Sequence, residues 1–117
     1  MNKYRNIRTE VDGIKFDSAK EARRYGELKL LQRAGEIIHL ESQKRYALEV
    51  NGMKIAEYVA DFVYVEVKSG KWIVEDVKPT FKTAKARKAY QATAAYRMFA
   101  IKKKLMLAIH NIEVIEV

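Results

Sequence analysis

Three charged side chains lie within the otherwise apolar segment IVEDVKP, which runs from Ile73 to Pro79. Glu75 and Asp76 are adjacent acids, and Lys78 follows two residues after Asp76. Because successive side chains of a β-strand point to opposite faces, Asp76 and Lys78 share one face and Glu75 lies on the other. We interpret Glu75 as an ordinary polar contact. A carboxylate and an ammonium on one face form either an ion pair or part of a metal-dependent site that acts on phosphate esters.

A further carboxylate, Asp61, lies in a row of valines within the segment from Glu57 to Val67. Both faces of this segment are mostly apolar, which predicts a central strand covered on each side. An unpaired carboxylate in such a strand is energetically costly. Asp61 therefore needs a cation, a cluster of hydrogen-bond donors or a metal ion.

The turn between these two predicted strands decides which residues meet. A two-residue turn at Ser69–Gly70 places Asp61 opposite Lys78. In this register Asp76 lies opposite Val63, diagonal to Asp61 on the same face. We expect a four-residue loop to give the same register, whereas a three-residue loop without a bulge would turn Asp61 to the wrong face. The favoured register brings Asp61, Asp76 and Lys78 together.

Asp61 and Asp76 at this spacing suit a shared divalent metal, with the intervening backbone carbonyl as a further oxygen ligand. The chain has no cysteine and only two histidines, so carboxylates must supply most ligands, which favours Mg²⁺ or Mn²⁺. Such a metal polarises a phosphodiester and lowers the pKa of bound water, and Lys78 would orient that water or stabilise charge on the phosphate. The alternative is an ordinary cross-strand ion pair between Asp61 and Lys78.

Glu21 is a third candidate acid, with two interpretations. The sequence SAKE, which ends at Glu21, matches a capping box, in which the glutamate caps the start of a helix. At about 100° per residue, however, Glu21 lies between Tyr25 and Leu28 on the sheet-facing side of that helix. The residue therefore caps the helix, contributes to the edge of the metal site, or does both.

The pattern of the whole chain predicts an α/β (α+β) fold in a single domain over residues 1–117. Hydrophobic periodicity, hairpin dipeptides and capping residues give a hairpin, a helix, three strands, a helix and a strand, with helices flanking a mixed central sheet. The predicted elements are a hairpin at Val11–Ile14, a helix from Asp17 to about Gly35, strands between Gln43 and Lys78 with turns at Asn51–Gly52 and Ser69–Gly70, a helix from about Thr83 to Lys104, and a final strand within Leu105–Val117.

The composition limits the class of protein and its partners. The formal net charge of +8 favours a polyanionic partner, nucleic acid first and an anionic membrane surface second. Apolar runs are too short to span a bilayer and no hydrophobic segment follows the first residues, so we expect neither a membrane protein nor a signal peptide. The absence of cysteine fits a cytoplasmic protein.

Glu21 on the first helix, Asp61 in YVADF, and Asp76 with Lys78 in VEDVK together resemble the motif of the PD-(D/E)XK nuclease superfamily. The predicted element order is similar to the αβββαβ, restriction-endonuclease-like core of that superfamily, and the resemblance covers most of the chain. The opening KYRNIRTEVDGIKFDSAKEARRY is similar to that of small phage and prophage members without an assigned function.

The resemblance implies a phosphodiester hydrolase that cuts DNA with one or two Mg²⁺ ions, for which Mn²⁺ substitutes. It makes Asp61 the first motif acid, Asp76 the second, Lys78 the motif lysine and Glu21 the helix acid. The implied metal ligands are then Asp61, Asp76 and Glu21, and all four residues are implied to be catalytic.

The chain departs from the motif at two positions. Ala60 stands where the motif has a proline, which is a tolerated variation. Pro79 follows the motif lysine where a small residue is more usual, and it should end the pairing of its strand there.

Positive residues follow the motif directly and open the second predicted helix. A DNA backbone lying across the acidic site would meet them, so we predict that they bind DNA; the alternative is a solvated helix face. Tyr90, Tyr96 and Phe99 are predicted to lie in the core rather than to stack on bases. The predicted DNA-binding residues are Lys82, Lys85, Arg87 and Lys88.

Three functions from different classes fit these residues. The first is a Mg²⁺-dependent DNA endonuclease, with branched DNA such as a Holliday junction in phage replication or recombination as a candidate substrate. A junction resolvase makes two cuts, so a homodimer in the host-cell cytoplasm is expected for it. The alternatives are a non-catalytic nucleic-acid-binding phage protein that retains the nuclease fold, and a structural or partner-binding phage protein whose charges are surface ion pairs.

Overall fold

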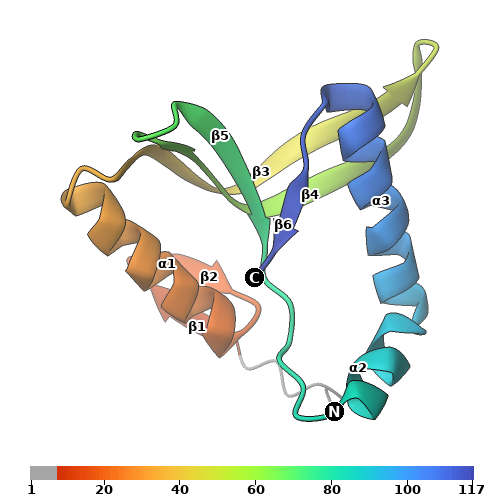
Figure 1. Cartoon of the computed structure of the whole chain (residues 1–117), viewed down its shortest axis with the longest axis horizontal. Coiled ribbons are helices and arrows are strands. Elements are labelled where there is room, and N and C mark those ends of the chain that lie inside the picture. Colours follow the sequence, from red (N-terminus) through yellow and green to blue (C-terminus); the bar gives the residue numbers. More distant parts are fainter. Residues whose placement is uncertain (1–7) are drawn as a thin grey trace.

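The computed structural model describes residues 8–117 as a mixed four-stranded sheet, a separate two-stranded hairpin and three helices (Figure 1). The elements are β1 (Thr9–Val11), β2 (Ile14–Phe16), α1 (Ala19–Arg33), β3 (Ile37–Val50), β4 (Met53–Glu66), β5 (Lys71–Asp76), α2 (Ala84–Gln91), α3 (Ala94–His110) and β6 (Val114–Glu116). The sheet order is β3-β4-β5-β6, and β6 runs parallel to β5 while the other neighbours are antiparallel. The predicted α+β class is confirmed.

Local sequence signals explain most element boundaries. The dipeptides Asp12–Gly13 and Asn51–Gly52 adopt positive φ angles between 52° and 76° and connect β1 to β2 and β3 to β4, as predicted. The hydroxyl of Ser18 accepts the N–H of Glu21 at 3.1 Å and caps the start of α1. Gly35, with φ of 81°, lies just beyond the end of α1. Strand β3 begins at residue 37, earlier than predicted.

The second predicted helix is two helices. Thr93 separates α2 from α3, because its hydroxyl donates to the carbonyl of Tyr90 at 2.7 Å and accepts the N–H of Tyr96 at 3.3 Å. A threonine that bonds its neighbouring backbone in this way competes with the helical hydrogen bonds and caps a new helix. Helix α3 continues to His110, where Asn111 ends it with φ of 56°, so the predicted final strand is confined to β6.

The register between β4 and β5 differs from the predicted one. The loop is formed by residues 67–70, so Glu66 pairs with Lys71, and the expectation that a four-residue loop preserves the predicted register was wrong. The ladder ends where Phe62 pairs with Glu75, which brings the next residues, Asp61 and Asp76, to the same level. The predicted pairings of Asp61 with Lys78 and of Asp76 with Val63 are therefore wrong. A shift of two residues keeps every side chain on its face, so the predicted grouping of the charges survives.

Strand β4 is covered on both sides, as predicted, but its alternation breaks at Asp61. Helix α3 covers one cluster of the core and α1 covers the other (Figure 1). Ala60 belongs to the α3 cluster, whereas Phe62, two residues later, belongs to the α1 cluster. Opposite Asp61, between the paired positions Ser42 and Lys44, Gln43 adopts a left-handed φ of 56°. Asp61 thus lies at the point in β4 where alternate side chains change from the α3 cluster to the α1 cluster.

Candidate active site

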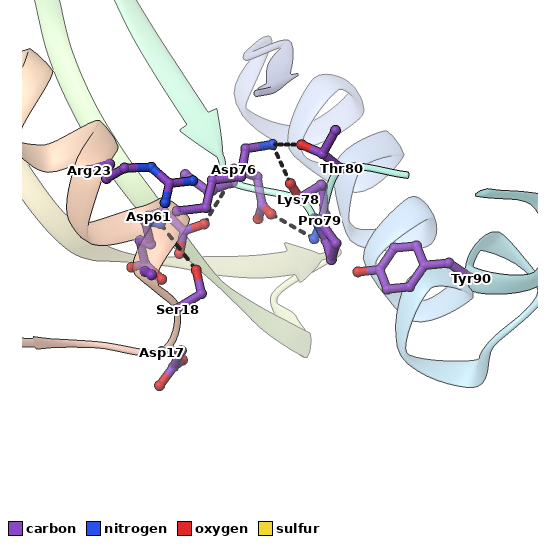
Figure 2. Close-up of a pocket in the computed structure, with 13 residues that line it drawn as sticks. Asp17, Ser18, Arg23, Asp61, Asp76, Lys78, Pro79, Thr80 and Tyr90 are labelled. Atoms are coloured by element: carbon purple, nitrogen blue, oxygen red, sulfur yellow. Dashed lines mark hydrogen bonds and ion pairs between the residues drawn. The ribbon is translucent and has the colours of Figure 1, made fainter. Parts of the chain in front are cut away.

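An open pocket of about 520 Å³ lies where the first turn of α1 meets the middle of β4, at Asp61, and the end of β5, at Asp76. Its walls include Glu21, Asp61, Asp76 and Lys78, so the structure brings together the four residues predicted to be catalytic. Figure 2 shows Asp61, Asp76 and Lys78 grouped beside the first turn of α1, with Tyr90 reaching toward them from α2. We call this the acidic pocket.

Asp76 is the last residue of β5, and both of its carboxylate oxygens are engaged. Its Oδ1 lies 2.6 Å from Nζ of Lys78. Its Oδ2 accepts a hydrogen bond from the hydroxyl of Tyr58 at 2.7 Å. Tyr58 is buried, and both its burial and the nearby Asp76 raise the pKa of its hydroxyl, which keeps it a donor. Sequence reasoning placed Tyr58 only on a strand face, without a role in the site.

The ammonium of Lys78 lies between a carboxylate and an aromatic ring. Its Nζ is 3.5 Å from the ring centroid of Phe99 in α3, as well as being paired with Asp76. The backbone N–H of Lys78 donates to the carbonyl of Val117 at 2.9 Å. Backbone pairing with the segment after β6 therefore continues to Lys78, the residue before Pro79. The ion pair between Asp61 and Lys78, which the sequence offered as the alternative to a metal site, is not the one formed: Lys78 pairs with Asp76.

Asp61 is half-buried and is held by the backbone of the neighbouring strand end. Its Oδ2 accepts the N–H of Val77 at 2.7 Å. Burial, followed by repulsion from Asp76, raises the pKa of Asp61 to about 6 despite the opposing effects of the Val77 N–H and Lys78. The Val77 N–H and Lys78 therefore do not fully offset the cost of burying a negative charge at Asp61.

Glu21 lies at the edge of the candidate site, as one of the two interpretations expected, and the hydroxyl of Ser18 makes the cap at the start of α1. The backbone N–H of Glu21 takes part in the cap at Ser18, while its side chain is buried and lines the acidic pocket. Burial, followed by repulsion from Asp61 and Asp17, raises the pKa of Glu21 to about 8. Sequence reasoning did not single out Asp17, an exposed acid one turn earlier that lines the same pocket.

The carboxylate oxygens of the pocket are the type of ligand that a divalent cation prefers, but their positions do not form a ready-made metal site. Within residues 8–117, no group of three or more His, Cys, Asp or Glu side chains is positioned to hold a metal ion. Yet Glu21, Asp61 and Asp76 repel one another, and the ammonium of Lys78 contacts Asp76. Oxygen donors with excess negative charge are the ligands that Mg²⁺ and Mn²⁺ prefer. Binding would require these side chains to rotate, with Asp76 giving up one of its two partners.

Glu75 lies on the opposite face, as alternation predicted, but it is more than an ordinary polar contact. Only 2% of its surface is exposed. Arg24 of α1 binds it through two nitrogens, with Nε 2.8 Å from Oε1 and Nη2 2.6 Å from Oε2. The hydroxyl of Tyr64 also donates to Oε2. This buried pair fastens α1, and with it Glu21, against β5.

Lys20, which sequence reasoning did not single out, ties down the segment that follows the motif. Its Nζ donates to the carbonyl of Lys78 at 2.5 Å, to the hydroxyl of Thr80 at 3.1 Å and to the Val117 carbonyl oxygen at 3.1 Å. Burial, followed by the nearby Arg23, lowers the pKa of Lys20. Its only sequence signal is its position next to Glu21.

The predicted DNA-binding residues are exposed. Helix α2 buries none of its residues, and the predicted basic residues project from it or from the turn before it. Phe99 is buried in the core, as predicted, but Tyr90 is half-buried and lines the acidic pocket, so its assignment to the core was wrong. Tyr96 is half-buried and packs against the core cluster that contains Phe99, which agrees with the prediction. The exposed basic residues are Lys82, Lys85, Arg87 and Lys88.

These features define an α+β protein whose mixed sheet carries an acidic, lysine-containing pocket at one strand end. Residues 1–109 match the family described as "Protein of unknown function (DUF1064)", and the chain belongs to this family. Neither the comparison with curated proteins nor that with solved structures found a match. Over residues 8–117, no helix is long and apolar enough to cross a bilayer.

Proposed function

We propose that this protein is a Mg²⁺-dependent DNA endonuclease that hydrolyses phosphodiester bonds. The observation that carries the proposal is the convergence of Glu21, Asp61, Asp76 and Lys78 in one open pocket of a chain with net charge +8. A basic protein attracts a polyanion, whereas an acidic pocket repels it unless a cation intervenes. A divalent metal bound in the pocket would offset the negative charge of the carboxylates and allow a DNA phosphate to approach them.

Three carboxylates would hold the metal. Asp61 and Asp76 are the principal ligands in this proposal, with Glu21 at the edge of the site, and Mn²⁺ would substitute for Mg²⁺. Bound there, the ion would polarise the phosphodiester and lower the pKa of a water molecule.

The chain's own residues would orient these groups. The Val77 N–H fixes one oxygen of Asp61, and the Tyr58 hydroxyl fixes one oxygen of Asp76. The Lys78 ammonium, 2.6 Å from Asp76, would supply positive charge to the phosphate when Asp76 turns to the metal.

The exposed basic residues of and beside α2 would bind the DNA backbone on the side from which Tyr90 reaches the pocket. Branched DNA, such as a Holliday junction in phage replication or recombination, belongs to the proposal as a candidate substrate. A homodimer acting in the host-cell cytoplasm accompanies that substrate, because resolving a junction takes two cuts.

A non-catalytic nucleic-acid binder that retains the fold is the second candidate. It is favoured by one observation: both oxygens of Asp76 are already engaged, by Lys78 and Tyr58. In that case the charged residues would serve stability and the exposed basic residues would serve binding.

A cleavage panel separates the two candidates. Linear, flapped and four-way DNA would be incubated with Mg²⁺ and with the wild type, Asp61→Asn, Lys78→Met or Glu49→Gln. The proposal predicts cleavage that falls about 100-fold or more in the first two variants. Glu49→Gln, an exposed acid of β3 outside the pocket, should cleave normally. Binding without any metal-dependent cleavage would favour the second candidate, and cleavage that survives both site substitutions would contradict the assigned site.

A further inference from the structure

A second pocket, of about 300 Å³, adjoins the acidic pocket on the side of α2. The two pockets share part of their walls, so a ligand in one lies directly beside a ligand in the other. Figure 2 shows Tyr90 and Pro79 facing each other at this boundary. The shared residues are Lys20, Lys78, Pro79, Thr80 and Tyr90.

An aromatic row forms one wall of the second pocket. The ring centroids of Phe81 and Tyr90 lie 5.1 Å apart, and Tyr90 meets Tyr96 edge-on at 5.4 Å. Tyr96 in turn lies 5.6 Å from Phe99, which is buried in the core. The row thus runs from the core to the half-buried Tyr90 and Phe81, where it borders the pocket. Rings held in place by such packing lose little conformational entropy when a planar ligand stacks on them.

Positive charge accompanies this aromatic wall. Arg87, exposed on α2, and Lys20 both line the pocket. The acid at its edge, Glu116, is already engaged by Nζ of Lys103 and by the hydroxyl of Tyr96, each at 3.0 Å. An aromatic surface beside cations suits a nucleotide, because the base stacks while its phosphate meets the positive charge.

We propose that the second pocket binds one unpaired nucleotide of DNA next to the phosphate held in the acidic pocket, with its base stacked on Tyr90 and its phosphate near Arg87. This inference rests on the proposed function and narrows its substrate class. A base inside a duplex has both faces stacked and its edge paired, so it cannot present a face to Tyr90 without being extruded. The preferred DNA therefore carries unpaired nucleotides at the cleavage point, as flaps and branch points do, rather than continuous duplex.

Binding without catalysis tests this pocket apart from the nuclease proposal. Asp61→Asn protein, in EDTA, would be titrated into a duplex whose short single-stranded flap carries 2-aminopurine, and into the matching continuous duplex. We expect tighter binding to the flapped DNA and quenching of 2-aminopurine as the base stacks. Adding Tyr90→Ala should weaken flap binding by at least about fivefold and abolish quenching, with duplex binding unchanged. Tyr90→Trp should retain both.

Trp72→Ala is the matched control, because Trp72 is an aromatic residue with 57% of its surface exposed and lies outside both pockets. It should bind flapped DNA like the parent protein. Equal affinity of the parent for flap and duplex, or flap binding indifferent to Tyr90→Ala in a folded variant, would overturn the inference. If quenching depends on Tyr90 but the wild type does not cut DNA, the nucleotide pocket is supported. In that case only the nuclease proposal is contradicted.

Discussion

The Lys78 ammonium lies 2.6 Å from Oδ1 of Asp76, while the ring of Phe99 lies beneath it at 3.5 Å. This contact joins the segment that follows β5 to α3, because Phe99 is a residue of α3 in the core cluster. Asp76 is therefore held from two sides, by Lys78 and by the Tyr58 hydroxyl. The orientation of this carboxylate depends on Tyr58 of β4 and on Lys78, which follows the end of β5.

Replacing Tyr58 by Phe should destabilise the protein and weaken metal binding. The substitution removes the only donor to Oδ2 of Asp76 among the described side chains and leaves a buried acceptor unsatisfied, at a cost of about 1–2 kcal/mol. Metal affinity should fall about 10-fold or more, because an orienting partner is lost. Urea unfolding and Mn²⁺ titration measure the two effects. Tyr96→Phe removes a comparable bond to the exposed Glu116 and should change neither much; equal effects of both variants would contradict the role of Tyr58.

Breaking the buried pair between Arg24 and Glu75 should be costly. Arg24→Met leaves a carboxylate that is 2% exposed with Tyr64 as its donor, and we expect a loss of about 3 kcal/mol in the free energy of unfolding. The double variant Arg24→Met/Glu75→Gln should recover part of that loss, because no charge is then stranded. Urea unfolding measures both. Arg45→Met, which breaks an exposed pair, should have little effect, and an equally small effect of Arg24→Met would show that Glu75 is not anchored as described.

Without metal, the protein should become less stable as the pH rises. Burial and repulsion from Asp61 raise the pKa of Glu21 in the folded state from 4.5 to about 8. Because the folded state holds this proton more tightly than the unfolded chain, the stabilisation is complete below pH 4.5 and is lost as the pH rises toward about 8. Glu21→Gln cannot titrate, so its stability relative to the wild type should increase over that interval. Unfolding curves in EDTA across this range measure the difference, and a constant difference would contradict a perturbed Glu21.

Removing positive charge from α2 should weaken DNA binding in a salt-dependent manner. If Lys85 and Lys88 each contact a phosphate, the double alanine variant should lower the magnitude of the slope of log affinity against log salt by about 2. Sequence preference should not change, because phosphate contacts carry no base information. The exposed Lys68, in the loop between β4 and β5, provides a control whose alanine variant should retain the wild-type slope. An unchanged slope in the double variant would mean that DNA lies elsewhere.

The sequence was sufficient to predict the faces of the charged residues. Alternation along a strand separated Glu75 from Asp76 and Lys78 whatever the register, because a shift of two residues preserves the face. Helical phase alone turned Glu21 toward the sheet. Both predictions depend on local geometry, and both agree with the structure.

The rest depended on contacts that local patterns do not encode. The register followed from the length of the loop at residues 67–70, which the Ser69–Gly70 dipeptide did not reveal. The break in alternation at Asp61 involves the left-handed Gln43 of the neighbouring strand. Tyr58 reaches Asp76 only because β4 and β5 pair, and Thr93 interrupts a pattern that otherwise reads as one continuous helix.

The central claim is that the acidic pocket holds a divalent metal, and calorimetric titration of Mn²⁺ into the wild type and Asp61→Asn tests it most directly. The account predicts a saturable site in the wild type that is lost in Asp61→Asn and retained in Glu49→Gln, the exposed acid of β3. Absence of binding to the wild type, or binding that Asp61→Asn leaves unchanged, would contradict it.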